Sequence, residues 1–319
     1  MADLKNELTW SFSRHSTLQA CPRRYYFRHY KYWNGWRDDA DPVVREIYRL
    51  TKLDGRFSWQ GQIIHRVIAR SLLQARDGRP VEDPKAAIAE AIGWMRQDYR
   101  DSRDDLARRT GDFKRHVRFF EHETGEDDGS PSWRARWKEC AQVVETGLGN
   151  FFGSRLYAKL KDLPARDWIE IEDPSSRVPP SFEAGGIRVN AKVDCAFRED
   201  GRPVVVDWKT GKRDMPALPT QLAAYALYMQ ERHGIAPNEL VAREVNVVTG
   251  KVQEYDVGPE QIEVFREVFE ESLARMRSYL SDVPGNVAKP EGEFPFTQDD
   301  RECRFCHFRS VCPKISAAF

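Results

Sequence analysis

The sequence predicts an α/β protein in which helices flank a mixed sheet. Two hydrophobic periods support this prediction. Residues 187–197 alternate apolar and polar side chains, which is typical of a strand with one buried face. Residues 259–280 instead repeat their apolar side chains at helical spacing. With 319 residues, the chain has room for one or two domains built from both kinds of element.

The first half of the chain is predicted to be largely helical. Residues 61–72 carry an apolar face at helical spacing. A second helix is expected over residues 84–107, because Asp83 followed by a proline is a typical helix start. A third long helix is expected over residues 133–160.

An acidic stretch separates the second and third of these helices. Residues 121–129 show no apolar period, so they predict a solvated loop. The alternative is a metal site that uses Glu121, His122 and Glu123.

Strands are predicted mainly in the second half. Residues 204–209 begin with an apolar run and follow a charged turn that contains glycine. This segment and the strand over residues 187–197 therefore predict a hairpin. Further strands are expected at residues 167–172, 240–248 and 251–257.

The predicted hairpin carries the most informative polar residues. Asp194 lies on the polar face of the first strand, and Asp207 and Lys209 share a face of the second. Two carboxylates that converge repel each other, and a divalent cation relieves that repulsion. Such a cation also promotes phosphoryl or carboxyl hydrolysis. The alternative is an exposed hairpin with scattered, solvated charges.

The hairpin belongs to a longer pattern, in which an aspartate precedes an Asp-x-Lys-Thr-Gly strand and a helix with Gln-x-x-x-Tyr. These motifs lie at Asp194, residues 207–211 and residues 221–225. The pattern resembles the RecB-like branch of the PD-(D/E)XK nucleases. The resemblance implies a restriction-endonuclease-like mixed sheet flanked by helices, here with a helical insertion before the hairpin.

The resemblance also implies roles for individual residues. Asp194, Asp207 and the Trp208 carbonyl would bind Mg²⁺ or Mn²⁺, and Lys209 would assist the attack on the phosphate. Gln221 and Tyr225 would approach the nucleic acid.

A histidine upstream extends this pattern. Gly61 and His65 lie one turn apart in the predicted helix over residues 61–72, and the glycine allows close backbone approach. In the same family, a Gly-x-x-x-His helix adds its imidazole to the metal ligands. The alternative is a structural histidine on an amphipathic helix.

Four cysteines form a second candidate site. Cys303 and Cys306 are separated by two residues, Cys312 follows, and Cys21 is the natural fourth ligand. We see no signal-peptide or membrane-spanning pattern, so we expect a cytoplasmic chain with reduced thiols and no membrane partner. The spacing therefore favours a metal or cluster over disulfides.

The context of these cysteines resembles the iron–sulfur members of the same nucleases. Those members include the AddB-type proteins, the exonuclease V group and the CRISPR-adaptation nucleases. The resemblance implies a [4Fe–4S] cluster that joins the N- and C-terminal segments as a staple. A zinc ion with four thiolates is the alternative.

Overall charge gives no bulk signature of nucleic-acid binding, since 50 Lys and Arg balance 50 Asp and Glu. Residues 1–37 are locally basic and rich in aromatic rings, however. This combination predicts contacts with a single strand through Arg23, Arg24 and Tyr25. The alternative is that the rings pack around the cluster.

The resemblance therefore implies a Mg²⁺- or Mn²⁺-dependent deoxyribonuclease that acts on single strands or ends, as an exonuclease rather than an endonuclease. It would serve DNA repair, CRISPR adaptation or phage defence, with a helicase or defence-complex protein as a possible partner. The alternative is a non-catalytic, DNA-end-binding scaffold subunit. Four segments are expected: an N-terminal segment with the first cysteine, a helical region, the nuclease core and a cluster-binding tail, over residues 1–60, 61–165, 166–280 and 281–319.

Overall fold

A computed structural model describes residues 5–113, 115–174, 176, 178–211 and 219–316. The chain divides into two compact units. One, here called the terminal unit, consists of Met1–Leu53, Glu183–Asn190 and Arg266–Phe319. The other, the sheet unit, consists of Asp54–Phe182 and Ala191–Phe265.

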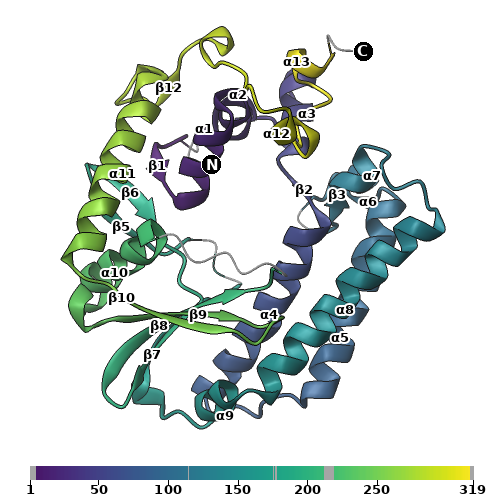
Figure 1. Cartoon of the computed structure of the whole chain (residues 1–319). Helices are drawn as coiled ribbons and strands as arrows, with labels where there is room; N and C mark the ends of the chain where they lie inside the picture. The colour runs from purple at the N-terminus through teal and green to yellow at the C-terminus, as the bar shows by residue number, and fades with distance from the viewer. Residues whose placement is uncertain (1–4, 114, 175, 177, 212–218, 317–319) are drawn as a thin grey trace. The chain divides into compact units, whose positions relative to one another are not determined.

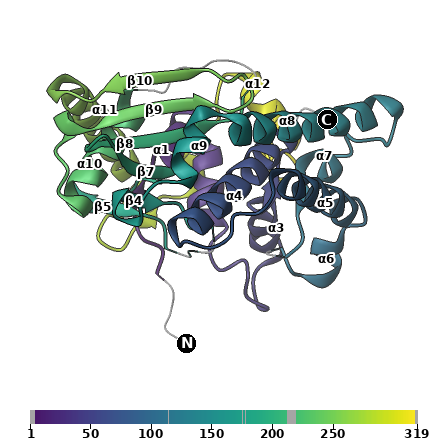
Figure 2. The ribbon, with the colours of Figure 1, turned by 90° about the horizontal axis from the view of Figure 1, so that it is seen from below.

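A five-stranded mixed sheet organises the sheet unit, as Figure 2 shows. Strands β8 and β9 are parallel, and the other neighbours are antiparallel. Parallel neighbours need a crossover, and α10 (Pro219–His233) supplies it. The predicted mixed α/β architecture and the hairpin of β7 and β8 are confirmed. The sheet order is β10 (Val252–Asp256), β9 (Val241–Asn246), β8 (Arg202–Lys209), β7 (Cys195–Glu199) and β4 (Trp168–Ile171).

The predicted continuous strand over residues 187–197 is wrong in its middle. Strand β6 (Ile187–Asn190) ends before residue 191, and β7 starts only at Cys195. Asp194 lies in the bend between them and is buried, not on a solvated strand face. The alternating pattern misled the prediction because Ala191 and Val193 are buried although they lie outside any strand.

Three long helices of the sheet unit lie side by side in both views (Figures 1 and 2). The Trp208 ring of β8 packs against the Phe151 ring of α8, with centroids 5.4 Å apart. Ile64 and Val67 of α4 are fully buried in the same hydrophobic core. The apolar stripes predicted from the sequence therefore form one layer against the sheet. These helices are α4 (Arg56–Arg76), α5 (Pro84–Arg103) and α8 (Pro131–Gly153).

Local capping sets helix limits that the periodicity missed. The helix that contains Gly61 begins after its N-cap Gly55, so the predicted boundary at residue 60 falls inside α4. The helix predicted over residues 133–160 ends at Gly153. There the Ser154 hydroxyl accepts a hydrogen bond from the Tyr157 amide and starts α9 (Arg155–Lys161).

The acidic stretch over residues 121–129 is not a simple solvated loop. Glu121 is buried, and the His122 side chain is only 7% exposed. His122 contacts Ser102 and Asp127, and Asp127 also accepts a 2.7 Å hydrogen bond from the Trp137 indole. Hydrogen bonding lets this acidic segment pack inside the helical layer. Residues 121–123 do not meet the spacing of a metal site in the described part of the chain.

The terminal unit contains most of the aromatic N-terminal segment. Phe27, Phe294 and Phe308 are almost fully buried, and the Phe27 and Phe308 rings pack 5.5 Å apart. β1 runs parallel to β6. Besides β6, the helices and strands of the terminal unit are β1 (Thr9–Trp10), α1 (Phe12–Ala20), α2 (Pro22–Tyr26), a π-helix (Phe27–Lys31), α3 (Pro42–Leu50), β11 (Leu280–Asp282), β12 (Val287–Ala288), α12 (Asp300–Arg304) and α13 (Pro313–Ser316).

Several elements are short or reach a unit boundary. Helix α11 (Pro259–Ser278) and strands β5 (Ser181–Ala184) and β2 (Leu53–Asp54) span boundaries. Among the helices of the described residues, none has the length and apolar character needed to cross a membrane. The remaining short elements are β3 (Arg118–Phe119), α6 (Leu106–Thr110), α7 (Phe120–Glu123) and the 3-10 turns Ala165–Asp167, Pro237–Glu239 and Glu291–Glu293.

Candidate metal and catalytic centre

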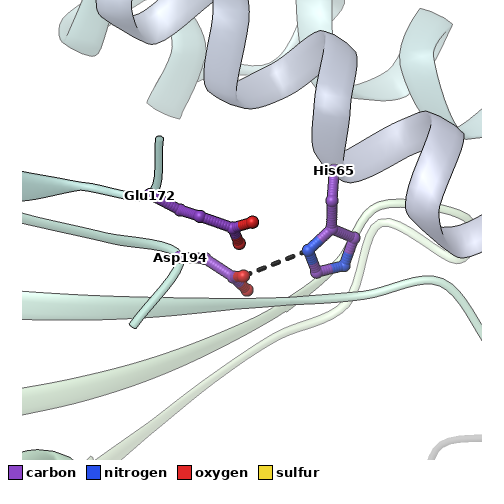
Figure 3. Close-up of side chains that lie close together, drawn as sticks. All are labelled: His65, Glu172 and Asp194. Carbon is purple, nitrogen blue, oxygen red and sulfur yellow. Dashed lines mark hydrogen bonds and ion pairs between the residues drawn. The ribbon is translucent and has the colours of Figure 1, made fainter. Parts of the chain in front are cut away.

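His65, Glu172 and Asp194 converge in the sheet unit, as Figure 3 shows. His65 projects from α4, Glu172 follows β4, and Asp194 precedes β7. One ligand atom from each residue lies within 4.8 Å of the other two. In the part of the chain that the structure describes, this is the one set of three or more His, Cys, Asp or Glu residues with that spacing.

Asp194 is held in place through both of its carboxylate oxygens. Its Oδ1 lies 3.0 Å from His65 Nδ1, and its Oδ2 accepts a 2.7 Å hydrogen bond from the Trp208 amide. Burial opposes the charge on Asp194, but the His65 imidazole and the Trp208 amide keep the pKa of Asp194 below its ordinary value. Burial also opposes a charge on His65, but the Asp194 carboxylate outweighs it and raises the pKa of His65 to about 9.

Asp207 is close enough to Asp194 to repel it, but it does not meet the 4.8 Å ligand spacing of this group and has its own partners. Its Oδ2 forms an ion pair with the Lys209 ammonium, and its Oδ1 accepts a 3.3 Å hydrogen bond from the Tyr225 hydroxyl. Gln221 donates to that hydroxyl at 2.8 Å. Burial and then repulsion from Asp194 raise the pKa of Asp207 to about 6, although Lys209 opposes the rise. The site thus holds two buried carboxylates whose charges conflict.

Glu172 was not singled out from the sequence, although the strand predicted over residues 167–172 ends on it. Its amide donates a 2.9 Å hydrogen bond to the Asp194 carbonyl, which fixes the end of β4 beside the bend before β7. Its carboxylate pairs with Lys192 at 2.6 Å. The sequence signal for Glu172 was only its place as an acidic residue at the end of a predicted strand. Acidic residues are common at such positions, so this signal is weak.

Close packing of α4 brings His65 to the acids. A Cβ atom added at Gly61 would lie 3.0 Å from the Thr210 hydroxyl oxygen, tighter than most such contacts. Gly61 therefore allows the helix to approach the segment that follows β8, as its place in the motif predicts. The two carboxylates supply the oxygen ligands that Mg²⁺ and Mn²⁺ prefer, and the imidazole is a ligand typical of transition-metal ions, so this donor set fits a divalent cation.

Cys21, Cys303, Cys306 and Cys312 line one cavity in the terminal unit. Burial raises the pKa of Cys306 to about 11, and the neighbouring thiols Cys21 and Cys312 also disfavour its ionisation. The Arg24 amide donates to the Cys21 sulfur at 3.5 Å. Four thiols that converge from both ends of the chain fit a metal or cluster better than scattered structural cysteines.

The residues beside Cys21 are largely used within the protein. The Arg23 guanidinium is buried, pairs with Glu291 at 2.9 Å and lies over the Phe296 ring. Tyr25 is completely buried, and Arg24 pairs with Glu302 at 3.0 Å but keeps partial exposure. Arg23 lines the cysteine cavity, and Tyr25 packs against His29 and Tyr30, so these contacts favour a structural role over nucleic-acid contact for both residues.

The fold and site together place acids, a histidine and a lysine at one end of the strands β4, β7 and β8 of a mixed sheet. The model of the PD-(D/E)XK nuclease superfamily matches residues 9–313. The chain therefore belongs to this superfamily. A comparison with curated protein sequences finds no match.

Proposed function

We propose that this chain is a divalent-metal-dependent nuclease that hydrolyses DNA phosphodiester bonds at single strands or ends. The convergence of His65, Glu172 and Asp194 beside the Asp207 and Lys209 pair carries the proposal. Membership of the superfamily supports nuclease chemistry, and the donor set supports Mg²⁺ or Mn²⁺. A cation held there would supply Lewis-acid stabilisation of the phosphate charge.

The protein residues have distinct roles in this proposal. Asp194, Asp207, His65, Glu172 and the Trp208 carbonyl would hold the cation. His65 and the Trp208 amide orient the Asp194 carboxylate through the hydrogen bonds at its two oxygens.

The ion pair at the end of β8 supplies the remaining chemistry. Lys209 would place its ammonium beside the phosphate, where negative charge builds during the displacement. Gln221 and Tyr225 support Asp207, because the glutamine donates to the tyrosine hydroxyl and that hydroxyl donates to the carboxylate. Burial raises the pKa of Tyr225, so its hydroxyl stays a donor across neutral pH.

Cleavage of end-labelled oligonucleotides tests this function. Single- and double-stranded substrates are incubated with Mn²⁺, with Mg²⁺ and with a chelator. The wild type should cleave only with a divalent cation and should prefer single strands or ends. Asp207→Asn should abolish cleavage, whereas Asp200→Asn should retain it. Asp200 is a matched control because its side chain is 92% exposed at the turn of the same hairpin. Normal cleavage by Asp207→Asn would refute the catalytic assignment.

We further propose a [4Fe–4S] cluster at the four cysteines, as in the iron–sulfur, RecB-like members of the superfamily. The four cysteines line one cavity, with one thiol from the N-terminal segment and three from the C-terminal tail, and this arrangement supports a group held by four thiolates. A zinc ion with four thiolates is the alternative.

The colour and metal content of the protein test the cluster. Anaerobically purified protein should be brown and contain about four iron and four sulfide per chain, as a cubane cluster requires. Stoichiometric zinc without iron would overturn the proposal. We also propose that the nuclease acts as an exonuclease. A partner would have to unwind any duplex, because the sequence carries no helicase motif.

A further inference from the structure

A pocket of about 450 Å³ in the sheet unit adjoins the candidate metal group. His65 and Glu172 form part of its wall, so whatever enters the pocket reaches the candidate catalytic centre. The volume is at the lower end of the range for small-molecule sites and suits one nucleotide rather than a duplex. Its other lining residues include Phe57, Gln62, Arg66 and Lys192.

Phe57 is the unusual residue of this pocket. It lies in the first turn of α4, and its side chain is 64% exposed. A single exposed ring is common on protein surfaces, but this one lies in the wall of the pocket that reaches the candidate metal group, where it is available to a bound substrate. A base that stacks on the ring would bury it.

Phe57 is also one end of a row of alternating rings and guanidinium groups. The Arg56 guanidinium lies 4.3 Å from the Phe57 ring centroid and 5.4 Å from that of Trp133. The Arg136 guanidinium covers the Trp133 ring at 4.4 Å. We call these four residues the aromatic–arginine ladder. It connects the start of α4 with the start of α8.

The chemistry of the ladder matches a single nucleic-acid strand. The exposed Phe57 ring can stack on an unpaired base, and the arginines beside it can neutralise phosphates. Trp133 is buried, so its ring contacts Arg56 and Arg136 rather than a base. In a duplex both faces of each base are already stacked, which leaves no face for Phe57. Arg66 adds positive charge at the pocket itself and is exposed, whereas the exposed Lys192 is paired with the Glu172 carboxylate.

We propose that the pocket and the aromatic–arginine ladder form a subsite for single-stranded DNA. The base next to the scissile phosphate enters the pocket and stacks on Phe57, and the strand continues along the ladder with phosphates near Arg56 and Arg136. This inference rests on the proposed nuclease function, since it assumes that the scissile phosphate lies at the metal group.

Binding measurements with a short single-stranded oligonucleotide test the stacking contact. With Ca²⁺ in place of Mn²⁺, Phe57→Ala should raise Kd about 5- to 150-fold, the range for loss of one stacked base. Phe57→Trp should bind like the wild type because it keeps a stacking face. Val252→Ala is the matched control, because Val252 is 53% exposed on edge strand β10, and its Kd should not change.

An abasic scan identifies the base involved. Oligonucleotides that lack a base at one position each are compared in the wild type and in Phe57→Ala. For the wild type, one position should weaken binding by about the same factor as Phe57→Ala does. In Phe57→Ala protein, loss of that base should have little further effect, because the two changes remove the same contact.

The outcomes separate this inference from the proposed function. Equal Kd values for wild type and Phe57→Ala, or identical abasic profiles, would overturn the subsite and make the ladder a cover for Trp133 only. Equal weakening of single-stranded and duplex binding would also overturn it, since stacking requires an unpaired base. If the wild type cleaves no DNA with Mn²⁺, the proposed nuclease function is refuted. The Kd values of wild type and Phe57→Ala then still decide whether the subsite binds a single strand.

Discussion

Replacement of either acid in the candidate centre should abolish cleavage but change stability in opposite directions. Without a divalent cation, Asp207→Asn should stabilise the protein at pH 7.5, whereas Asp194→Asn should destabilise it. The reason is that the pKa of Asp207 is raised to about 6, while the pKa of Asp194 is lowered. A carboxyl group with a raised pKa is a net cost when ionised, and one with a lowered pKa is a net gain.

The magnitude follows from the shift in the pKa of Asp207. From an ordinary 3.8 to about 6 is a rise of about 2 units, or about 3 kcal/mol at 1.36 kcal/mol per unit. That pKa already includes the opposing effect of Lys209, and the figure is an upper bound because the buried amide of Asn is itself a polar group that is costly to bury. For Asp194→Asn, we expect a loss of about 1.5–3 kcal/mol, the range for hydrogen bonds to charged groups.

The pH dependence of the unfolding free energy provides a second test of the predicted stability changes. The folded protein binds the Asp207 proton more tightly than the unfolded chain does, so the cost of Asp207 is absent below about pH 3.8 and complete above about pH 6. The benefit of Asp194 is present above its unfolded pKa of 3.8 and is lost as pH falls through its lowered folded pKa. The stability gain of Asp207→Asn should therefore shrink as the pH falls from 6 toward 4.

Urea and thermal unfolding in the presence of a chelator measure these effects. For a unit of this size, a change of 1 kcal/mol shifts Tm by about 2–4 °C, so Asp207→Asn should gain up to about 10 °C at pH 7.5. Added Mn²⁺ should raise the Tm of the wild type more than that of Asp207→Asn, because a ligand stabilises only the form that binds it. If Asp207→Asn is less stable than the wild type at pH 7.5 without a divalent cation, the inferred conflict between the two carboxylates is wrong.

Three further variants test other parts of the site. Lys209→Ala should lower the single-turnover cleavage rate by orders of magnitude with only a few-fold change in DNA affinity, because its role is at the transition state; a normal rate at saturating DNA would make it a binding residue instead. Glu172→Gln should weaken Mn²⁺ binding measured by calorimetry about 10-fold or more, and unchanged affinity would remove Glu172 from the ligand set. Cys21→Ala should lose the visible absorbance and lower Tm as much as Cys306→Ala, whereas Cys140→Ala should stay brown; a fully loaded Cys21→Ala would show that another group is the fourth ligand.

Local sequence signals predicted the elements that carry the site better than they predicted its geometry. The helix with His65, the strand with Asp207 and Lys209, and the helix with Gln221 and Tyr225 all form. The helix with His65 has an apolar face at helical spacing, and the strand with Asp207 has an apolar run after a charged turn, so local signals indicated the type of both elements. Their convergence, by contrast, depends on long-range contacts such as the packing of Gly61 against Thr210, which no local period encodes.

The break in the chain before β7 shows why the geometry of the site could not be predicted from the sequence. Alternation favoured a continuous strand through Asp194, but hydrogen bonds from Trp208 and the proximity of His65 hold its buried carboxylate in a bend. A straight strand with alternating faces predicts a solvated carboxylate at this position. The alternation rule fails at Asp194 because the contacts with His65 and Trp208 determine the local backbone more strongly than the hydrophobic pattern does. The resulting bend brings the carboxylates of Asp194 and Glu172 close together. The departure from regular strand structure is therefore what assembles the candidate metal group.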